Sequence, residues 1–279
     1  MLVPISLCSI FLNDDTSAQI ITFVLGSASM TTWAIKAFQN GKMPHLRKMA
    51  LLSFLTIAAL IFSAQALLEG VDISGYTTGV NFNTVKANGI KFVYIKATEG
   101  TTFKSDLFSS QYTGATNAGL IRGAYHFARP DVSSGATQAN YFASNGGGWS
   151  SDGITLPGVL DIENNPYGSQ CYGLSQSQMV SWIQDFSNTY QSRTGRYPGK
   201  IEVIYTTTSW WTTCTGNSAA FGKNNPLWIA RWASSVGTLP SGWSFWTFWQ
   251  NSDNASPNPG DHNYFNGDET QLSRFATGS

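Results

Sequence analysis

The chain has few cysteines, few histidines and little charge, and each shortage excludes a class of protein. Its 279 residues include three cysteines and three histidines, and 11% are charged, with 16 basic and 16 acidic residues. No Cys-x-x-Cys pair or histidine cluster is present to form a zinc site. No basic excess is available to hold nucleic acid through its phosphates. The sequence also lacks a short-period repeat, a low-complexity tract and an evident Ser-His-Asp order.

One apolar run near the N-terminus has the form of a secretory signal peptide. A short basic segment precedes the run at residues 49–62, and small residues follow at 63–66, where a signal peptidase would read them. The run is too short for a confident membrane span, although a retained N-terminal anchor is the alternative. We therefore predict a signal peptide at 43–66, cleavage after Ala66, and a secreted protein without stable membrane association.

The residues before this segment have no clear helical or strand period. They carry Asn13, Asp14 and Asp15 in the middle of the run. Signal peptides stand at the start of proteins, so we expect translation to begin at Met43 or Met49. On this interpretation, residues 1–42 are a non-native upstream extension or are disordered.

The remaining residues, 67–279, have a length that suits one domain with its own core. Twelve basic and fourteen acidic residues remain, giving a formal net charge of about −2. Cys171 and Cys214 also remain, and an even pair in a secreted chain indicates one disulfide. Closing that loop would contribute roughly 4 kcal/mol in the chain-entropy model. A zinc site is the other interpretation of the pair, but no further ligand motif supports it.

The stretch at 156–163 reads as a buried strand that ends in two acids. Side chains alternate along a strand, so Asp161 and Glu163 share one face and Ile162 points to the other. Crowding and burial raise carboxyl pKa values, and a carboxylic acid still protonated near neutral pH suits general acid catalysis. The alternative is a pair of loop acids held by backbone N–H groups or by salt bridges.

Strands and helices alternate over much of the chain. Alternating or apolar β-branched runs predict strands at 70–74, 90–96, 120–127, 156–163, 201–206, 227–232 and 245–250. Helical spacing and Gly stops predict helices at 82–89, 105–118, 134–144 and 175–195. No clear helix separates the last strands. The pattern favours parallel β-α units in a single short, irregular, TIM-like (β/α) barrel with fewer helices than strands.

Acids stand at the ends of several predicted strands, and active sites of such barrels lie at the carboxyl ends of their strands. We therefore expect four acids to converge on one mouth, namely Asp72, Glu99, Asp161 and Glu163. Scattered acids on solvated loops are the alternative. His126 is a weaker candidate base, because a hydrogen-bonded packing role is commoner for such a residue.

Paired carboxylates together with many aromatics point to cleavage of sugars. One acid would protonate the leaving oxygen, and a second group would stabilise or attack the anomeric carbon. Aromatic faces offer flat surfaces for sugar rings, although each such residue alone is more often part of the core. The candidates are Tyr125, Trp149, Tyr167, Trp210, Trp232 and Trp249.

Six motifs in order resemble glycoside hydrolase family 25, the Chalaropsis-type lysozymes. The resemblance runs from about Gly70 to Phe275 and rests on Gly70-Val71-Asp72-Ile73-Ser74, Ile95-Lys96-Ala97-Thr98-Glu99-Gly100, Gly123-Ala124-Tyr125-His126-Phe127, Leu160-Asp161-Ile162-Glu163, Trp249-Gln250 and Asp261-His262-Asn263-Tyr264-Phe265-Asn266-Gly267. Two positions depart from the family pattern: Gly260 replaces an apolar residue, and Asn251 replaces an aromatic one.

The resemblance implies a barrel enzyme, a monomer, that cleaves the β-1,4 bond between N-acetylmuramic acid and N-acetylglucosamine in peptidoglycan. It assigns the acid/base role to Glu163, the neighbouring carboxylate to Asp161, and the two further acids of the site to Asp72 and Asp261. It implies no metal or cofactor. Substrate contacts are expected from Tyr125, Glu99, Trp232, Trp249 and Tyr167, and a cysteine pair placed like this one resembles fungal-type members.

The chemical route and two rival functions stay open at this point. A retaining pair of carboxyls sits about 5–5.5 Å apart and an inverting pair about 6.5–9.5 Å apart. The Asp-x-Glu spacing favours a third route, in which the acetamido oxygen of the substrate attacks and Asp161 orients it. The rivals are a non-catalytic glycan-binding barrel and a chitinase-like hydrolase, although residues 157–160 lack the extra acids of a chitinase signature.

Overall fold

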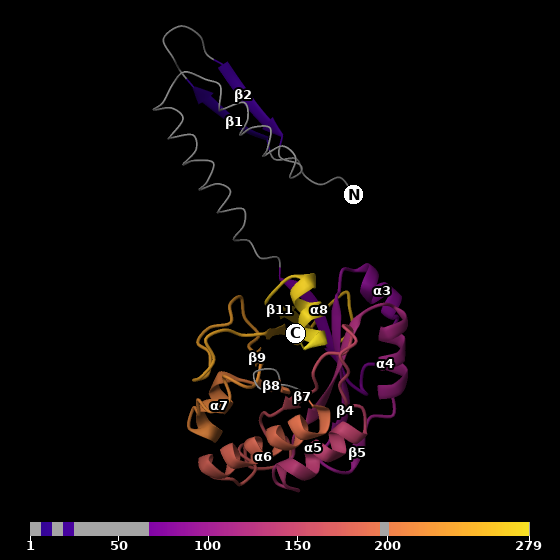
Figure 1. Ribbon diagram of the computed structural model, residues 1–279, viewed down its shortest axis with the longest axis vertical. Coiled ribbons are helices and arrows are strands. Elements are labelled where there is room, and N and C mark those ends of the chain that lie inside the picture. The colour runs from indigo at the N-terminus through magenta and orange to yellow at the C-terminus, as the bar shows by residue number, and fades with distance from the viewer. Residues whose placement is uncertain (1–6, 13–18, 25–66, 196–200, 279) are drawn as a thin grey trace. The chain divides into compact units, whose positions relative to one another are not determined.

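The computed structural model describes residues 7–12, 19–24, 67–195 and 201–278 of the chain, which fall into two compact units. In the smaller unit, β1 (Leu7–Leu12) pairs antiparallel with β2 (Gln19–Val24) (Figure 1). The sequence analysis found no clear strand period at 1–42 and did not predict these two strands. Ser9, Gln19 and Thr22 interrupt the apolar residues without a strict alternation, so neither segment shows the pattern by which a half-buried strand is recognised. The predicted signal peptide lies outside the described residues.

The larger unit contains a closed barrel of eight strands (Figure 1). Around the ring the strands are β3 (Leu68–Ile73), β11 (Asp261–Phe265), β10 (Phe248–Ser252), β9 (Leu227–Ala230), β8 (Val203–Thr206), β7 (Val159–Asp161), β6 (Ile121–Phe127) and β4 (Phe92–Glu99). Pairing of β3 with β4 closes the ring, and the short β5 (Phe103–Lys104) pairs with β4 outside it.

Six helices accompany the eight barrel strands in the described part of the chain, which confirms the prediction of a short barrel with fewer helices than strands. They are α3 (Phe82–Ala87), α4 (Phe108–Asn117), α5 (Gly135–Ser144), α6 (Gln176–Thr194), α7 (Thr208–Thr215) and α8 (Glu269–Thr277). Figure 1 shows α3 and α4 together on one side of the barrel and α5 with α6 on another. No helix in these ranges has the length and apolarity needed to cross a bilayer.

Helix α7 lies between β8 and β9, where no clear helix was expected. The side chain of Thr207 caps its first turn by accepting a hydrogen bond from the Trp210 N–H at 3.1 Å. Gly216, in a left-handed conformation at φ +66°, ends the helix. Both signals are in the sequence, but adjacent residues Trp210 and Trp211 are both buried, so the helix lacks the single apolar stripe that marks an amphipathic helix.

Seven barrel strands run parallel, and β11 runs antiparallel to both of its neighbours, β10 and β3. The sequence analysis predicted parallel units where strands and helices alternate, and it did not predict the strand at β11. Only residues 253–260 connect β10 to β11, and a parallel crossover needs about a dozen residues or more. The start of β11 therefore lies at the barrel end where the parallel strands finish.

The barrel separates two apolar layers. Inside it, large rings such as Phe92, Tyr94, Trp228 and Phe248 fill the end where the parallel strands begin, and α8 adds Leu272 and Ala276 to this cluster. Outside it, the helices pack on the outward-facing residues of the strands, among them Ile95, Leu160, Ile162, Ile204 and Ile229. Apolar filling of one end leaves the other end for polar side chains.

Candidate active site

Four carboxyl groups meet at the polar end of the barrel. Asp72 comes from β3, Asp161 ends β7, Glu163 lies two residues beyond it, and Asp261 begins β11. All four line one pocket of about 110 Å³, together with Tyr125, Tyr205, Trp228 and Gln250. Asp72 and Asp261 are direct partners in the antiparallel pairing of β3 and β11, which brings their backbones together.

The alternation predicted for the stretch ending in Asp161 and Glu163 is confirmed. Both acids line the pocket, whereas Ile162 between them is fully buried in the layer between barrel and helices. The Ile162 N–H donates to the Tyr205 carbonyl at 3.0 Å, so the backbone pairing with β8 continues past the end of β7. This extension keeps Glu163 on the same face as Asp161.

Two amide side chains hold the pair of acids on β3 and β11. The Gln250 Nε2 group donates to Asp72 Oδ2 at 2.9 Å and to Asp261 Oδ2 at 3.2 Å. The Asn263 Nδ2 group donates to the same Asp72 oxygen at 2.7 Å. The sequence analysis did not single out these amides, although both lie at inward positions of strands that carry the family motifs.

Aromatic donors fix the orientation of both amides. Tyr205 donates its hydroxyl to Gln250 Oε1 at 2.9 Å, and Trp232 Nε1 donates to the same oxygen at 3.0 Å. Trp228 Nε1 donates to Asn263 Oδ1 at 2.8 Å. With their oxygens occupied by donors, the two amides present their NH₂ groups to the carboxylates.

Burial raises the pKa values of Asp161 and Glu163, and neighbouring acids add to the rise: Glu163 for Asp161, and Asp261 for Glu163. Burial is the main cause for Asp161, whose pKa lies well above its ordinary value, and the charge of Glu163 adds to it. Burial likewise raises the pKa of Glu163, whereas the nearby Lys96 ammonium opposes the rise in both acids. Asp161 Oδ1 is buried and has no hydrogen-bond partner among the described residues. At least one carboxyl of this pair therefore stays protonated at pH values where an ordinary carboxyl group is ionised.

The pKa of Asp72 is raised to about 7, first by burial and then by the negative charge of Asp261, against the hydrogen bonds from Asn263 and Gln250. The pKa of Asp261 is also raised, by burial and by the charge of Asp253. In the described part of the chain, no three His, Cys, Asp or Glu side chains are arranged to hold a metal ion.

Glu99, the remaining predicted acid, lies outside the pocket lining in a cationic network. Lys96 Nζ contacts its Oε2 at 2.7 Å, the Tyr167 hydroxyl donates to its Oε1 at 2.7 Å, and Arg129 Nη1 lies 3.8 Å from that oxygen. Burial acts to raise the pKa of Glu99, but these partners hold it below its ordinary value. Glu99 is therefore an ionised partner of the cations, and its negative charge makes a small addition to the rise in the pKa of Asp161.

Of the predicted aromatic contacts, one lines the pocket and two are exposed. The ring of Tyr125 lines the pocket itself. Trp232 follows β9 and is 61% exposed, and its indole nitrogen is bound to Gln250 in the pocket wall. Tyr167 is 62% exposed, with the Arg129 guanidinium 4.1 Å from its ring centre.

Trp249 and His126 lie away from the pocket. Gln250 lines the pocket, so Trp249 beside it points outward, where it is buried and donates to the Arg231 carbonyl at 2.8 Å. This placement does not support the predicted sugar contact by Trp249. His126 is fully buried between Thr98 and Gln138, and burial lowers its pKa to about 4, as suits a neutral packing residue.

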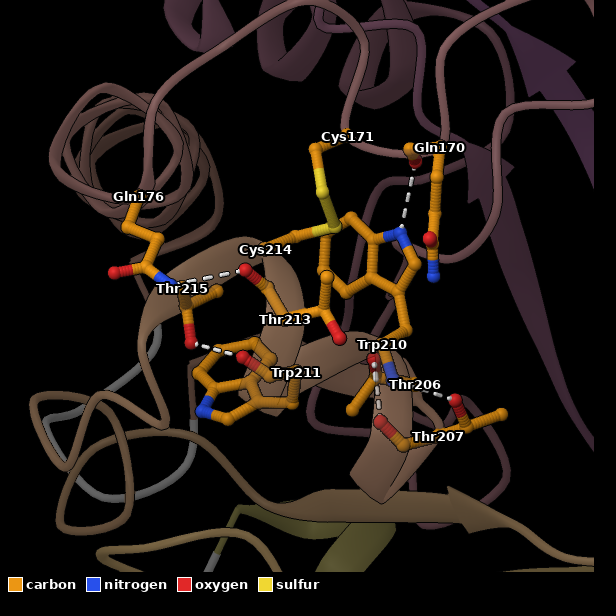
Figure 2. The surroundings of a disulfide bond; sticks show 10 residues. All are labelled: Gln170, Cys171, Gln176, Thr206, Thr207, Trp210, Trp211, Thr213, Cys214 and Thr215. Carbon is orange, nitrogen blue, oxygen red and sulfur yellow. Dashed lines mark hydrogen bonds between the residues drawn. A yellow bond between two sulfur atoms is a disulfide. The ribbon is translucent and has the colours of Figure 1, made fainter.

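The predicted disulfide is present between Cys171 and Cys214, whose Cα atoms are 5.3 Å apart (Figure 2). It joins the loop that follows β7 to helix α7. Beside it, Trp210 Nε1 donates to the Gln170 carbonyl at 3.1 Å and Gln176 Nε2 donates to the Thr213 carbonyl at 3.1 Å. The loop that carries Tyr167 is therefore attached to α7 by a covalent bond and to its surroundings by hydrogen bonds.

Comparison with known proteins agrees with this geometry. The model of the glycosyl hydrolases family 25 matches residues 71–259, a range that includes Asp72, Asp161 and Glu163 and stops just before Asp261. An N,O-diacetylmuramidase of Arthroderma benhamiae is 53% identical over 238 residues, covering 81% of this chain and 99% of that protein. An N,O-diacetylmuramidase of a Chalaropsis species is 52% identical, covering 76% of this chain and all of that protein.

Solved structures show the same likeness. A muramidase from Acremonium alcalophilum has 64% identity and a TM-score of 0.73, covering 76% of this chain and 100% of its own. A family GH25 lysozyme from Aspergillus fumigatus has 55% identity and a TM-score of 0.73, covering 76% of this chain and 99% of its own.

Proposed function

The chain belongs to the glycosyl hydrolases of family 25, and we propose that it is a secreted lysozyme that cleaves bacterial peptidoglycan. The bond cut would be the β-1,4 linkage between N-acetylmuramic acid and N-acetylglucosamine. The observation that carries this proposal is the meeting of four carboxyl groups in one pocket at the end of the barrel. Hydrolysis of a glycosidic bond requires at least one carboxyl that is protonated at the working pH and one group that stabilises or attacks the positively charged anomeric carbon.

We assign the general acid and base to Glu163. It lines the pocket, and burial raises its pKa, so that a proton is retained for the leaving oxygen. After the first step the same carboxylate would accept a proton from the attacking water. Its position just beyond the end of β7 sets it at the pocket wall beside Asp161.

Asp161 is proposed to orient the acetamido group of the substrate, whose oxygen would attack the anomeric carbon. Asp161 and Glu163 point to the same side of one strand, so they are poorly placed to flank a sugar from opposite faces. NMR of the first product formed should show retention of the anomeric configuration. Initial release of the inverted anomer would rule this route out.

Asp72 and Asp261 are proposed to bind and stabilise the reacting sugar from the other wall of the pocket. The shared amide of Gln250 holds them together, and the pKa of Asp72 near 7 lets it donate or accept a hydrogen bond around neutral pH. Tyr125 in the pocket lining and the exposed rings of Trp232 and Tyr167 would contact neighbouring sugars.

Glu99 and Trp249 would contribute to substrate binding indirectly. Glu99 accepts the hydroxyl hydrogen of Tyr167, and so holds that ring at the rim. Trp249 binds the carbonyl of Arg231, the residue before Trp232, and supports the segment that presents Trp232. The disulfide supports the proposal of secretion, because such bonds persist in oxidising compartments.

Digestion of purified peptidoglycan by the wild type and by Glu163→Gln tests the proposal. Gln has the size of Glu but has no proton to donate, so only the wild type should release fragments. Mass analysis should find muramic acid at the new reducing ends. Activity on chitin with none on peptidoglycan would indicate a chitinase-like enzyme, and glycan binding without turnover would indicate a binding protein.

A further inference from the structure

A second groove lies at the end of the barrel opposite the acidic pocket, with a volume of about 460 Å³. Its lining includes Leu227 at the start of β9, Thr247 just before β10, and Phe265 at the end of β11. Because β11 runs antiparallel to the others, these positions share one end of the barrel. Asp72 and Asp261 lie at the other end, so a ligand in this groove would leave the acidic pocket free.

Aromatic rings form the floor and one wall of the groove. Phe275 on α8 lies on the floor, with its ring centre 5.7 Å from that of Phe248 and 6.2 Å from that of Phe265. Phe245 and Trp246 line the wall, and Phe245 is 64% exposed. An aromatic side chain so exposed gains little from the core, which makes it available to a partner.

Two cations stand in the same lining without acidic partners. Lys223 and Arg274 are both exposed, and neither forms an ion pair with a described residue. By contrast, Lys91 pairs with Glu269 at 2.6 Å and Arg129 pairs with Asp131 at 2.9 Å. The described lining contains no Asp or Glu. The groove thus combines aromatic faces with uncompensated positive charge.

We propose that this groove is a second binding surface for the substrate polymer, which takes sugar rings on Phe245 and Trp246 and peptide carboxylates on Lys223 and Arg274. The proposal rests on the proposed function. Aromatic faces suit the apolar faces of sugars, and a guanidinium suits a carboxylate in a bidentate geometry. Peptidoglycan carries both groups on one strand, whereas chitin offers only the rings.

Binding there would hold the enzyme on an insoluble wall between successive cleavages. The wall is then a ligand at one end of the barrel and a substrate at the other. A soluble oligomer reaches the acidic pocket by diffusion. Its rate of cleavage should therefore not depend on the groove. Loss of a remote binding surface should slow cleavage of the insoluble wall only, whereas loss of a part of the active site should slow cleavage of both substrates.

Binding is best measured in full chains that also carry Glu163→Gln, so that the wall is not consumed. We expect Phe245→Ala and Arg274→Gln each to weaken binding to purified insoluble peptidoglycan about tenfold, the usual scale for losing an anchor residue. Phe245→Tyr and Arg274→Lys keep the ring and the charge, and should bind nearly as the parent does. Arg274→Gln should also reduce the salt dependence of binding and leave binding to chitin unchanged.

With Glu163 intact, the Phe245→Ala and Arg274→Gln variants should clear a wall suspension more slowly but cleave soluble oligomers at the wild-type rate. Unchanged wall binding in both variants, with melting temperatures equal to the parent, would overturn the proposal. A dimer in sedimentation that Phe245→Ala dissociates would also overturn it, because the occupant would be a second copy. If Glu163→Gln kept its activity, the catalytic assignment would fail, whereas the comparison of wall binding between the parent and its groove variants would still test the groove.

Discussion

Asp72 and Asp261 face each other across the antiparallel pair of β3 and β11, and one amide nitrogen of Gln250 donates hydrogen bonds to both. A single neutral donor therefore lies between two acids that repel each other. The hydrogen bond to Asp72 favours its charged form and partly offsets the rise in its pKa from burial and from Asp261. The amide thus lowers the pKa of Asp72, as the hydrogen bond from Asn263 does more strongly.

Replacing Gln250 by Met should raise the pKa of Asp72 further above its present value of about 7, because a donor to the charged form is lost. The limb of the pH–rate profile that reports Asp72 should move to higher pH, and kcat/KM should fall about 10- to 100-fold. Asn251→Ala is a control, since the Asn251 side chain contacts His262 instead. An unchanged profile for Gln250→Met would contradict this account.

Replacing Lys96 by Met should raise the pKa values of both Asp161 and Glu163, because the Lys96 charge lowers both. The pH optimum for hydrolysis of a soluble oligomer should shift upward. Lys96→Arg keeps the charge and should leave the optimum near that of the wild type. A downward shift, or equal behaviour of the Met and Arg variants, would show that Lys96 does not set these ionisations.

Glu202 is a fully buried acid remote from the proposed mechanism, and burial raises its pKa to about 7 from an ordinary 4.5. Its Oε1 accepts a hydrogen bond from Ser187, whereas its Oε2 has no partner among the described residues. Since the folded-state pKa is the higher one, ionisation in the unfolded chain destabilises the fold as the pH rises from about 4.5 to 7. That cost reaches at most about 3 kcal/mol above pH 7.

Glu202→Gln should therefore raise the free energy of unfolding at pH 8 relative to the wild type and have little effect at pH 4. Urea denaturation at the two pH values measures the difference. A new unpaired amide N–H would reduce the gain at both pH values alike, so the difference between them is the diagnostic quantity. A change that is the same at pH 4 and pH 8 would show that Glu202 does not titrate in this range.

Gly260 immediately precedes Asp261 and has a left-handed φ of +80°. A Cβ atom at this position would overlap the carbonyl oxygen of Asp72. Gly260→Ala should therefore lower the free energy of unfolding by about 1–3 kcal/mol and displace Asp261, with loss of activity. Gly119→Ala is the matched control, because its φ is +74° but a Cβ would meet nothing within 4 Å. Equal losses in the two variants would mean that backbone strain alone, without the overlap, accounts for the effect.

The sequence predicted the part of the site that depends on local geometry. Strand alternation places Asp161 and Glu163 on one face wherever the strand lies, so that pair was predicted from spacing alone. The end of a parallel strand predicts Asp72 in the same way. Asp261 was reached only through family resemblance, because it begins its strand, and only the reversal of β11 brings that beginning to the mouth.

The other differences between expectation and structure come from interactions that cross between elements or from alternation that was not applied. Glu99 does end a strand, but it lies outside the pocket lining, where Lys96 and Arg129 bind it. Trp249 precedes an inward-facing Gln250, so the same alternation that predicted the acids would have placed it outside. The amide bridge itself could not be predicted, since it joins three strands whose order around the barrel is not evident from spacing.

The ring of strands is sealed where its first and last members, β3 and β11, pair with each other. A ribosome makes those two segments at opposite ends of this domain, so a growing chain holds Asp72, Asp161 and Glu163 long before it holds their fourth companion. The pocket is consequently a late product of synthesis, because its fourth carboxyl group exists only after residue 261 has been added.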